Sequence, residues 1–369
     1  MKIGIMTFHR AMNYGARLQA FALSEVLSER HDVSIIDYKC DYIDADYYKN
    51  KNLKKSIKSF IKLIIYRKHE LDVRKKNERF KAFNNDYIHL TGEFTANTID
   101  VLNSEFDVFM SGSDQVWNTR ITQEDWNYFL TFAENTKKFS YAASFGGSFL
   151  EADKREQIRD ALSTFKSILI RENTGVDILT ELGLYNEKVK VVADPVFLLS
   201  KEKWIQSVNL KQYSGDYILV YIVAKQTNLI NYVNQLARKE GLPIYWINLY
   251  GELKKCPDGF IEIADAGPKE FLEWILNAKY VVTTSFHALA FALIFNKPFY
   301  YELNTSSNNN NSRLQNLADI FKINDREITD QCYKPQKMLE WNLLNGILEE
   351  YKVKSTNLLW NSLSVKYDV

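Results

Sequence analysis

The sequence predicts an α/β protein with two Rossmann-like, doubly wound domains that face each other across a cleft. The chain has 369 residues, which is more than one ordinary hydrophobic core contains. Short apolar runs of β type alternate with helical segments, as a parallel sheet requires. The alternation occurs twice, with a break at Asp194-Pro195. We therefore expect one domain over residues 1–200 and a second, with the C-terminal helices, over residues 201–369.

The first half opens with an apolar strand over Lys2–Phe8, a turn over Asn13–Ala16 and a helix over Leu18–Leu27. A strand over Asp32–Tyr38 completes a β-loop-α-β start that is typical of a Rossmann-like domain. The loop lacks a G-x-G-x-x-G pattern, so dinucleotide binding is not indicated. Further strands are expected at Phe106–Ser111, Lys138–Phe145, Ser167–Arg171 and Lys188–Asp194.

The second half opens with a strand that begins at Tyr217 and a helix near Asn228–Glu240. Pro268 suits the first position of the next helix, which runs to Asn277, because the N–H that proline lacks would have no partner there. Strands at Pro243–Ile247, Tyr280–Thr283 and Pro298–Glu302 complete the series. A polar loop at Asn304–Asn311, a helix beginning near Ser312-Arg313 and a helix at Met338–Lys352 follow.

The overall composition is that of a soluble globular protein, with 46% apolar residues and a net charge of +1. This balance gives no global argument for nucleic-acid binding. The cysteines, Cys40, Cys256 and Cys332, fit neither a disulfide framework nor a metal site, so we expect a reducing, cytoplasmic setting. The N-terminus lacks the apolar region of a signal peptide, and no apolar run approaches the ~20 residues of a membrane span.

One segment departs from this balance. Between Lys49 and Lys81 there are 13 Lys and Arg residues against three acidic residues, a net charge of +10. Apolar residues at helical spacing predict a basic amphipathic helix within residues 49–83. One interpretation is a helix that lies on the anionic surface of a membrane, at the inner face of that membrane. The other is a solvated face whose apolar stripe packs on the domain.

The most informative single residue is His287. Ser285 is a good N-cap and Ala288–Phe295 is strongly helix-forming, so His287 falls in the first turn of a helix that follows a strand. Ligands bind at the carboxyl ends of strands in such sheets, and the N–H groups of a helix N-terminus favour an anion. The placement indicates a site for a phosphate or carboxylate. A buried histidine that is satisfied by backbone groups is the alternative.

Polar residues also follow other predicted strands. After the first strand come Gly15, which lets a ligand approach the backbone, and Asn13, which either caps the helix or donates an amide; Arg17 and Gln19 follow them. A Gly/Ser loop after the strand at Phe106–Ser111 contains Ser113 and Asp114, and its Trp117 either stacks on a sugar ring or lies in the core.

Two arginines follow predicted strands or loops in the same way. Arg171 ends a strand, and Arg313 opens a helix after the asparagine-rich loop. Arginine binds a carboxylate or phosphate through two parallel hydrogen bonds. Paired with Glu172 or another acid, however, Arg171 would be structural.

In this order and spacing, the motifs resemble those of the polysaccharide pyruvyl transferase family. The likeness is distributed over most of the chain and includes Lys2–Arg10, Asn13–Ala20, Ser111–Asn118, Arg171-Glu172, Asp194–Val196, Gly267-Pro268 with Phe271, Asn277-Ala278, Ser285–Ala288 and Ser312–Leu314. The resemblance implies a GT-B-like fold with the active site in the interdomain cleft. It also implies that phosphoenolpyruvate donates its pyruvyl group to two hydroxyls of a sugar, forming a cyclic ketal and releasing phosphate.

The resemblance further implies roles for particular residues. His287 aligns with the functional histidine of the family and Arg171 with a donor-binding arginine, with Ser285, Phe286 and Arg313 beside the donor. Many members have an arginine two residues before this histidine, where this chain has Ser285. Arg313 and Arg17 are the alternatives for its role. Asp114 and Glu172 are candidates for protonating the methylene carbon.

The implied acceptor is a cell-surface polysaccharide or its lipid-linked precursor. Phosphoenolpyruvate would be a co-substrate, and neither a cofactor nor a metal is expected. Two other functions fit the sequence. A nucleotide-sugar-dependent glycosyltransferase would share the two-domain architecture, and the departure at Ser285 would suit a non-catalytic glycan-binding relative.

Overall fold

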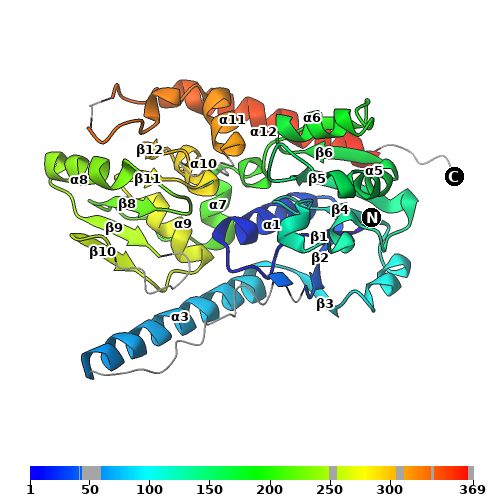
Figure 1. Cartoon of the computed structure of the whole chain (residues 1–369), viewed down its shortest axis with the longest axis horizontal. Coiled ribbons are helices and arrows are strands. Elements are labelled where there is room, and N and C mark those ends of the chain that lie inside the picture. Colours follow the sequence, from blue (N-terminus) through cyan, green and yellow to red (C-terminus); the bar gives the residue numbers. More distant parts are fainter. Residues whose placement is uncertain (41, 44–59, 249–255, 305–310, 334–335, 365–369) are drawn as a thin grey trace.

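In a computed structural model, the chain forms two parallel β-sheets that are covered by helices (Figure 1). The structure describes residues 1–40, 42–43, 60–248, 256–304, 311–333 and 336–364; for residues 60–69 it describes the backbone. The sheets lie towards opposite ends of the long axis, and α1 (Tyr14–Leu27) and α10 (Phe286–Ile294) lie between them (Figure 1). The predicted class, α/β with two Rossmann-like domains, is confirmed.

The first sheet has the strand order β3-β2-β1-β4-β5-β6-β7, and each pair of neighbours is parallel. β2 spans the residues that the sequence predicts, whereas β3 was not predicted. The strands are β1 (Lys2–Met6), β2 (Asp32–Tyr38), β3 (Leu90–Phe94), β4 (Val108–Ser111), β5 (Lys138–Ala143), β6 (Ser167–Ile170) and β7 (Val189–Val191). Between them lie α1, α3 (Phe60–Tyr87), α4 (Thr119–Thr122), α5 (Arg155–Ser163) and α6 (Asn173–Glu181).

The second sheet has the order β10-β9-β8-β11-β12, again parallel throughout. Its strands are β8 (Ile218–Tyr221), β9 (Ile244–Ile247), β10 (Phe260–Ile263), β11 (Tyr280–Thr283) and β12 (Phe299–Tyr301). The helices of this half are α7 (Lys201–Val208), α8 (Leu229–Glu240), α9 (Pro268–Asn277), α10, α11 (Ser312–Phe321) and α12 (Trp341–Ser364). Inner strands such as β8 and β4 are buried along their whole length, because helices cover both faces.

The C-terminal helix lies differently from our expectation. We placed the C-terminal helices in the second domain, but α12 returns to the first sheet and contacts β6 and the short helix at Pro195–Leu198. The hydroxyl of Ser355 on α12 accepts a hydrogen bond of 2.9 Å from the backbone N–H of Ala193, just after β7. The chain therefore passes from the first half to the second before β8 and returns to the first half with α12.

Aromatic side chains pack the two halves together. The ring of Tyr14, the first residue of α1, stacks on Phe271 of α9 with a centroid distance of 4.4 Å. Its hydroxyl donates to the carbonyl oxygen of Ala266 at 2.8 Å. Both rings are fully buried, so the contact belongs to a core that runs through both halves. This packing fixes the position of the α1 N-terminus relative to the second sheet.

The basic segment contributes to the same interface. α3 extends well beyond the first sheet and passes beneath the second in Figure 1. Lys75 and Arg79 bind the carboxylate of Asp265 at 2.6 and 3.1 Å, and Arg79 also reaches Glu270 at 3.3 Å. Part of the positive charge of α3 is thus used within the molecule. Residues 49–59 of the predicted basic helix lie outside the described residues. Among the residues that the structure describes, no helix is long and apolar enough to cross a membrane.

Candidate active site between the two sheets

A polar cavity of about 230 Å³ lies between the two halves. Its lining comes largely from the carboxyl ends of four strands: Asn13 and Gly15 after β1, Asp114 and Gln115 after β4, Tyr221, Val223 and Ala224 at and after β8, and Thr284, Ser285, Phe286 and His287 after β11. β1 and β4 are the neighbours at which the strand order of the first sheet reverses, and β8 and β11 are those of the second. Such reversal points are where open α/β sheets bind ligands. The cavity therefore lies at the ligand-binding edges of both sheets.

His287 reaches this cavity from the first turn of α10. Ser285 caps the helix, because its hydroxyl accepts from the backbone N–H of Ala288 at 3.4 Å. The imidazole ring packs against the backbone of Gly15, where even a Cβ atom would overlap the ring. Gly15 belongs to the first half and His287 to the second, so their contact closes one wall of the site. The residue at position 15 has to be small for this ring position to exist.

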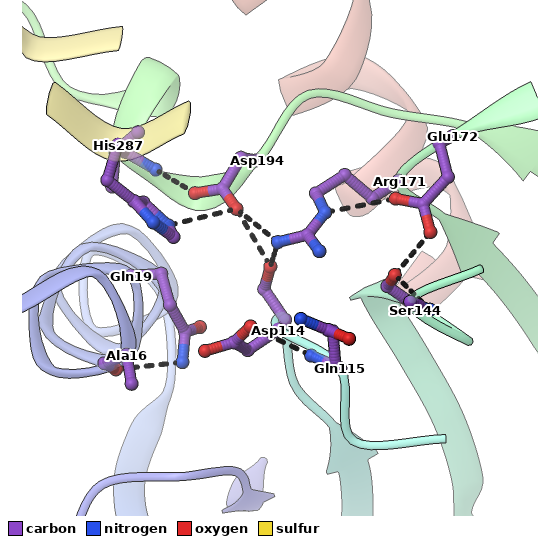
Figure 2. Close-up of polar contacts among 12 residues, drawn as sticks. Ala16, Gln19, Asp114, Gln115, Ser144, Arg171, Glu172, Asp194 and His287 are labelled. Atoms are coloured by element: carbon purple, nitrogen blue, oxygen red, sulfur yellow. Dashed lines mark hydrogen bonds and ion pairs between the residues drawn. The ribbon is translucent and has the colours of Figure 1, made fainter. Parts of the chain in front are cut away.

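Asp194, which follows β7, has its carboxylate beside the side chain of His287 (Figure 2). Its Oδ2 is 3.7 Å from His287 Nε2 and accepts from Ser113 Oγ and Arg171 Nη1, each at 3.0 Å. Burial alone would raise the pKa of this carboxyl group. His287, Arg171 and the backbone N–H of Val196 outweigh it and hold the pKa well below its usual range. Asp194 is thus a buried anion that faces the histidine.

Arg171 is held between two acids. Its Nε binds Glu172 Oε2 at 3.1 Å, and Glu172 in turn accepts from the Ser144 hydroxyl (Figure 2). Burial alone would lower the pKa of Arg171, but Glu172 and Asp194 raise it. The guanidinium lies 5.5 Å from the ring centre of Phe286 and is not part of the cavity lining. The expected donor-binding arginine therefore has the structural pairing that we weighed as its alternative.

Arg313, on the first turn of α11, does line the cavity. Its Nε is buried and has no hydrogen-bond partner among the described residues. Burial lowers the pKa of this guanidinium, and the nearby Arg171 lowers it further. Of the two arginines placed beside the donor in the sequence analysis, Arg313 is the one that presents its charge to the cavity.

Asn13 and Asp114 also line the cavity. Asn13 caps α1 by accepting from Ala16 N–H at 3.2 Å, which is the first of the two roles that we considered, and it also lines the cavity. Asp114 adopts a positive φ of 79°, which is rare for a residue other than glycine. Its Oδ1 accepts from the N–H of Gln115 at 2.9 Å. Residues held in such conformations cluster at functional sites, because the strain has to be maintained by the surroundings.

Four residues that we expected to contact substrate do not line the cavity. Trp117 is completely buried and stacks on Phe129, so its faces pack in the core and not on a sugar. Gln19 is also fully buried and donates to Thr7 Oγ1 at 2.8 Å. Arg17 is not part of the cavity lining and donates to the carbonyl oxygen of Ala11 at 2.9 Å. Ser113 lies behind the lining, bound to Asp194.

The part that Asp194 plays in the site was not predicted, because Asp194-Pro195 was interpreted as a domain boundary. Its position at the end of the strand predicted over Lys188–Asp194 was the signal available. Ser144, Thr284, Asn304 and Asn311 were also missed as members or supports of the site. Among the described residues, no group of three or more His, Cys, Asp or Glu side chains could hold a metal ion.

Comparison with known proteins identifies the family. The family model of polysaccharide pyruvyl transferases matches residues 13–304, which include every residue of the cavity wall named above except Arg313 and Asn311. The chain belongs to this family. A search of curated proteins gave no significant match.

Solved structures show how this pyruvyl transferase family member compares in fold. The UDP-GlcNAc 2-epimerases of Methanocaldococcus jannaschii and Neisseria meningitidis match with TM-scores of 0.51 and 0.50, at 12% and 11% identity. The matches cover 99% and 98% of this chain, and 100% and 99% of theirs. Anabaena HepE, in complex with UDP and glucose, matches with a TM-score of 0.50 at 10% identity, over 99% of this chain and 100% of its own. The chain thus has the GT-B-type architecture.

Proposed function

We propose that the protein transfers the pyruvyl group of phosphoenolpyruvate to two hydroxyls of a sugar in a cell-surface polysaccharide or its lipid-linked precursor. Beyond the family, one observation carries this proposal. Arg313 Nε is buried at the cavity and has no hydrogen-bond partner among the described residues. A buried donor without a partner is costly, and a charged one more so. An anion that enters the cavity would relieve this cost.

Phosphoenolpyruvate fits this requirement because it carries a phosphate and a carboxylate. Arg313 can bind either group through parallel N–H donors. The first turn of α10, on which His287 lies, adds the positive end of a helix dipole on the same wall. Arg313 thus takes the part of the arginine that many family members carry two residues before the histidine.

The reaction needs two proton transfers. One acceptor hydroxyl adds to the enol carbon while the methylene carbon gains a proton and becomes a methyl group. The second hydroxyl then displaces phosphate, and the released phosphate takes up the second proton. Both protons come from the two hydroxyls, so the groups that move them act as acid and base in turn.

His287 and Asp114 are the titratable side chains that line the cavity and are suited to this task. His287 exchanges a proton with the departing phosphate, while Asp194, whose Oδ2 lies 3.7 Å from Nε2, orients the imidazole, as a carboxylate does in many histidine-dependent sites. Asp114, which also lines the cavity, takes the proton of an acceptor hydroxyl. Glu172 is fully engaged with Arg171 and Ser144, so we no longer propose it as the proton donor to the methylene carbon.

The first test is thermal unfolding with phosphoenolpyruvate, inorganic phosphate or UDP. A ligand that binds the folded state raises the midpoint with concentration. We expect a rise with phosphoenolpyruvate that Arg313→Gln abolishes, and release of phosphate with gain of a pyruvyl mass in a panel of galactosides and N-acetylmannosaminides. A rise with UDP alone would instead favour a nucleotide-sugar glycosyltransferase. If phosphoenolpyruvate bound without turnover across the panel, a non-catalytic relative would be favoured.

We also propose a cytoplasmic location with peripheral contact at the membrane through the basic segment at residues 49–81. The described part of α3 keeps some of this charge exposed, as at Arg74, although Lys75 and Arg79 bind the second half of the molecule. Flotation with vesicles containing anionic lipid at low salt tests the contact, because screening weakens it at high salt. Absence of binding at low salt would remove this proposal.

A further inference from the structure

Two side-chain amides from the first half of the chain line the cavity, those of Asn13 and Gln115. Asn13 lies in the loop after β1 and Gln115 in the loop after β4, and these two strands are neighbours in the first sheet. Asp114 precedes Gln115 in the chain and lines the same cavity. An amide has an oxygen that accepts and a nitrogen that donates, so its orientation decides which of the two a ligand meets.

The orientation of the Gln115 amide follows from a backbone N–H group. Asn118 is the N-cap of α4, and its Oδ1 accepts from Arg120 N–H at 3.2 Å. A backbone N–H can only donate, so the oxygen of Asn118 has to face it, and Asn118 Nδ2 donates to Gln115 Oε1 at 3.1 Å. The oxygen of Gln115 is therefore committed to Asn118. Its Nε2 has no hydrogen-bond partner among the described residues and is the part of the amide that is open to a ligand.

Gly146 keeps this arrangement possible. Its φ is 74°, in the region that favours glycine, and a Cβ atom there would overlap Gln115 Oε1 and Asn118 Nδ2. A larger residue at position 146 would push the two amides apart. The glycine thus preserves the hydrogen bond that orients Gln115.

The Asn13 amide is oriented in the same way, because its Oδ1 accepts from Ala16 N–H at 3.2 Å. Its Nδ2 donors therefore remain for a ligand in the cavity. Asp114 supplies an acceptor beside them. Its Oδ1 accepts from Gln115 N–H at 2.9 Å, whereas its Oδ2 has no hydrogen-bond partner in the described part of the chain. The three side chains together offer two amide donor groups and one carboxylate acceptor.

This set suits a pair of neighbouring sugar hydroxyls. A hydroxyl oxygen accepts through its lone pairs and donates its single proton. One hydroxyl can therefore accept from Gln115 and donate to Asp114, while the second accepts from Asn13. A negatively charged group suits these residues less, because it would face the Asp114 carboxylate. Arg313 and the first turn of α10 serve an anion from the second half of the chain.

We propose that Asn13, Asp114 and Gln115 bind two neighbouring hydroxyls of a neutral sugar, and that Asn118 is a positioning residue that makes Gln115 a donor. The hydroxyls bound here are those that receive the pyruvyl group. That last assignment rests on the proposed pyruvyl transfer; the binding of the diol does not.

Asn118→Asp tests the orientation without changing a residue of the cavity lining. Aspartate caps a helix as well as asparagine does, so Arg120 N–H keeps its acceptor. The other carboxylate oxygen of residue 118 can only accept, so the Gln115 amide has to turn, donate Nε2 to it and present its oxygen to the cavity. A hydroxyl whose proton is committed to Asp114 then meets a second acceptor and has no proton left for it.

The measurement is the binding of methyl galactoside and methyl N-acetylmannosaminide by saturation-transfer NMR titration, without phosphoenolpyruvate. We expect the parent to bind at least one glycoside, and Asn118→Asp to bind it about tenfold more weakly, the scale of one mispaired polar group. Gln115→Glu should show the same loss, because its side chain keeps the shape and has no donor. Gln123→Glu is the matched control, since it adds the same charge at the C-cap of α4, where Gln123 donates to Arg120 O, and it should bind as the parent does.

The turn of the amide is observable without ligand. In protein made with isotope-labelled glutamine, the side-chain amide protons of Gln115 are assigned from their absence in Gln115→Glu. They should move downfield in Asn118→Asp, because they then donate to a carboxylate. Unchanged amide resonances would show that Asn118 does not orient Gln115, and this part of the proposal would be wrong.

Phosphoenolpyruvate separates this proposal from the proposed function. Asn118→Asp and Gln123→Glu add the same charge, so both should show the same rise of the unfolding midpoint with phosphoenolpyruvate. The diol proposal would be overturned if the parent bound neither glycoside, if Asn118→Asp and Gln123→Glu bound it equally, or if Asn118→Asp lost phosphoenolpyruvate binding instead. Glycoside binding in the expected pattern without pyruvyl transfer would support the diol site and contradict the proposed function.

Discussion

The backbone of Gly15 and the imidazole ring of His287 lie in direct contact across the interface between the two halves, and a Cβ atom at residue 15 would overlap the ring. The histidine that we propose as an acid-base group is therefore positioned by a residue of the other domain. Its place in the site depends on the packing of the halves as well as on its own helix.

The first prediction is that Gly15→Ala displaces His287 and lowers the rate of phosphate release by about a hundredfold, since small misplacements of reacting groups have effects of that size. Overpacking should also lower the free energy of unfolding by about 1–3 kcal/mol. Gly346→Ala is the control, because a Cβ there meets no atom within 4 Å. Equal activity in the two variants would show that the contact does not position the histidine.

The second prediction concerns Arg313. Arg313→Gln should weaken phosphoenolpyruvate binding about tenfold to a hundredfold, as for loss of a hydrogen bond to a charged group. Without ligand, the variant should be as stable as the parent or more stable, because burial penalises the guanidinium and lowers its pKa. Calorimetric titration and urea unfolding measure the two effects. A destabilised variant with normal donor affinity would assign Arg313 to the fold.

The third prediction is that Arg171, unlike Arg313, stabilises the fold in the absence of ligand. Arg171→Gln leaves Glu172 and Asp194 buried without their cation, which should cost about 3–5 kcal/mol of stability. Urea unfolding should therefore show a clear fall in the midpoint even without ligand. A stable Arg171→Gln variant that had lost donor binding alone would restore the role that the family resemblance implied.

The fourth prediction is a pH dependence of stability that originates at Lys76. Its side chain is buried between the halves and donates to the carbonyl oxygen of Asn248, and burial lowers its pKa from 10.5 to about 7. Between these values the unfolded chain holds a proton that the folded chain lacks, so stability rises with pH. From pH 7 to 9, this lysine should contribute about 2 kcal/mol.

Lys76→Met should remove that rise, whereas Lys75→Met, on the exposed side of the same helix, should keep it. The measurement is the free energy of urea unfolding at both pH values. Parallel changes in the parent and in Lys76→Met would mean that the buried lysine keeps its usual pKa.

Much of the fold was predictable because burial leaves a strong signal in the inner strands. β2 and β11, for example, span the residues that their apolar runs predicted. β3 and β10 were missed, and both are edge strands whose residues, apart from Ile263, are half-buried or, as at Gly92 and Glu262, exposed. An edge strand is defined by its hydrogen-bonded neighbour, which no local pattern of apolar residues reveals.

The candidate site was predictable in outline, because side chains at the ends of parallel strands share one edge. The sequence could place His287 and Arg313 near an anion, but not decide which arginine is neutralised by acids. That decision depends on Asp194, which lies 23 residues from Arg171 in the chain. The core position of Trp117 was equally hidden, since a tryptophan after a strand suits either a ligand or the aromatic cluster of Phe129 and Phe145.

The return of α12 to the first sheet has a consequence for biosynthesis. Residues 193 and 355 meet through one hydrogen bond, so the ribosome has to produce almost the whole chain before the first sheet can be covered at β6. Until then, the apolar residues against which α12 packs, such as Phe197, remain open to other chains. A nascent chain stalled before residue 341 should therefore depend on chaperones, and its first half should not mature independently of its second.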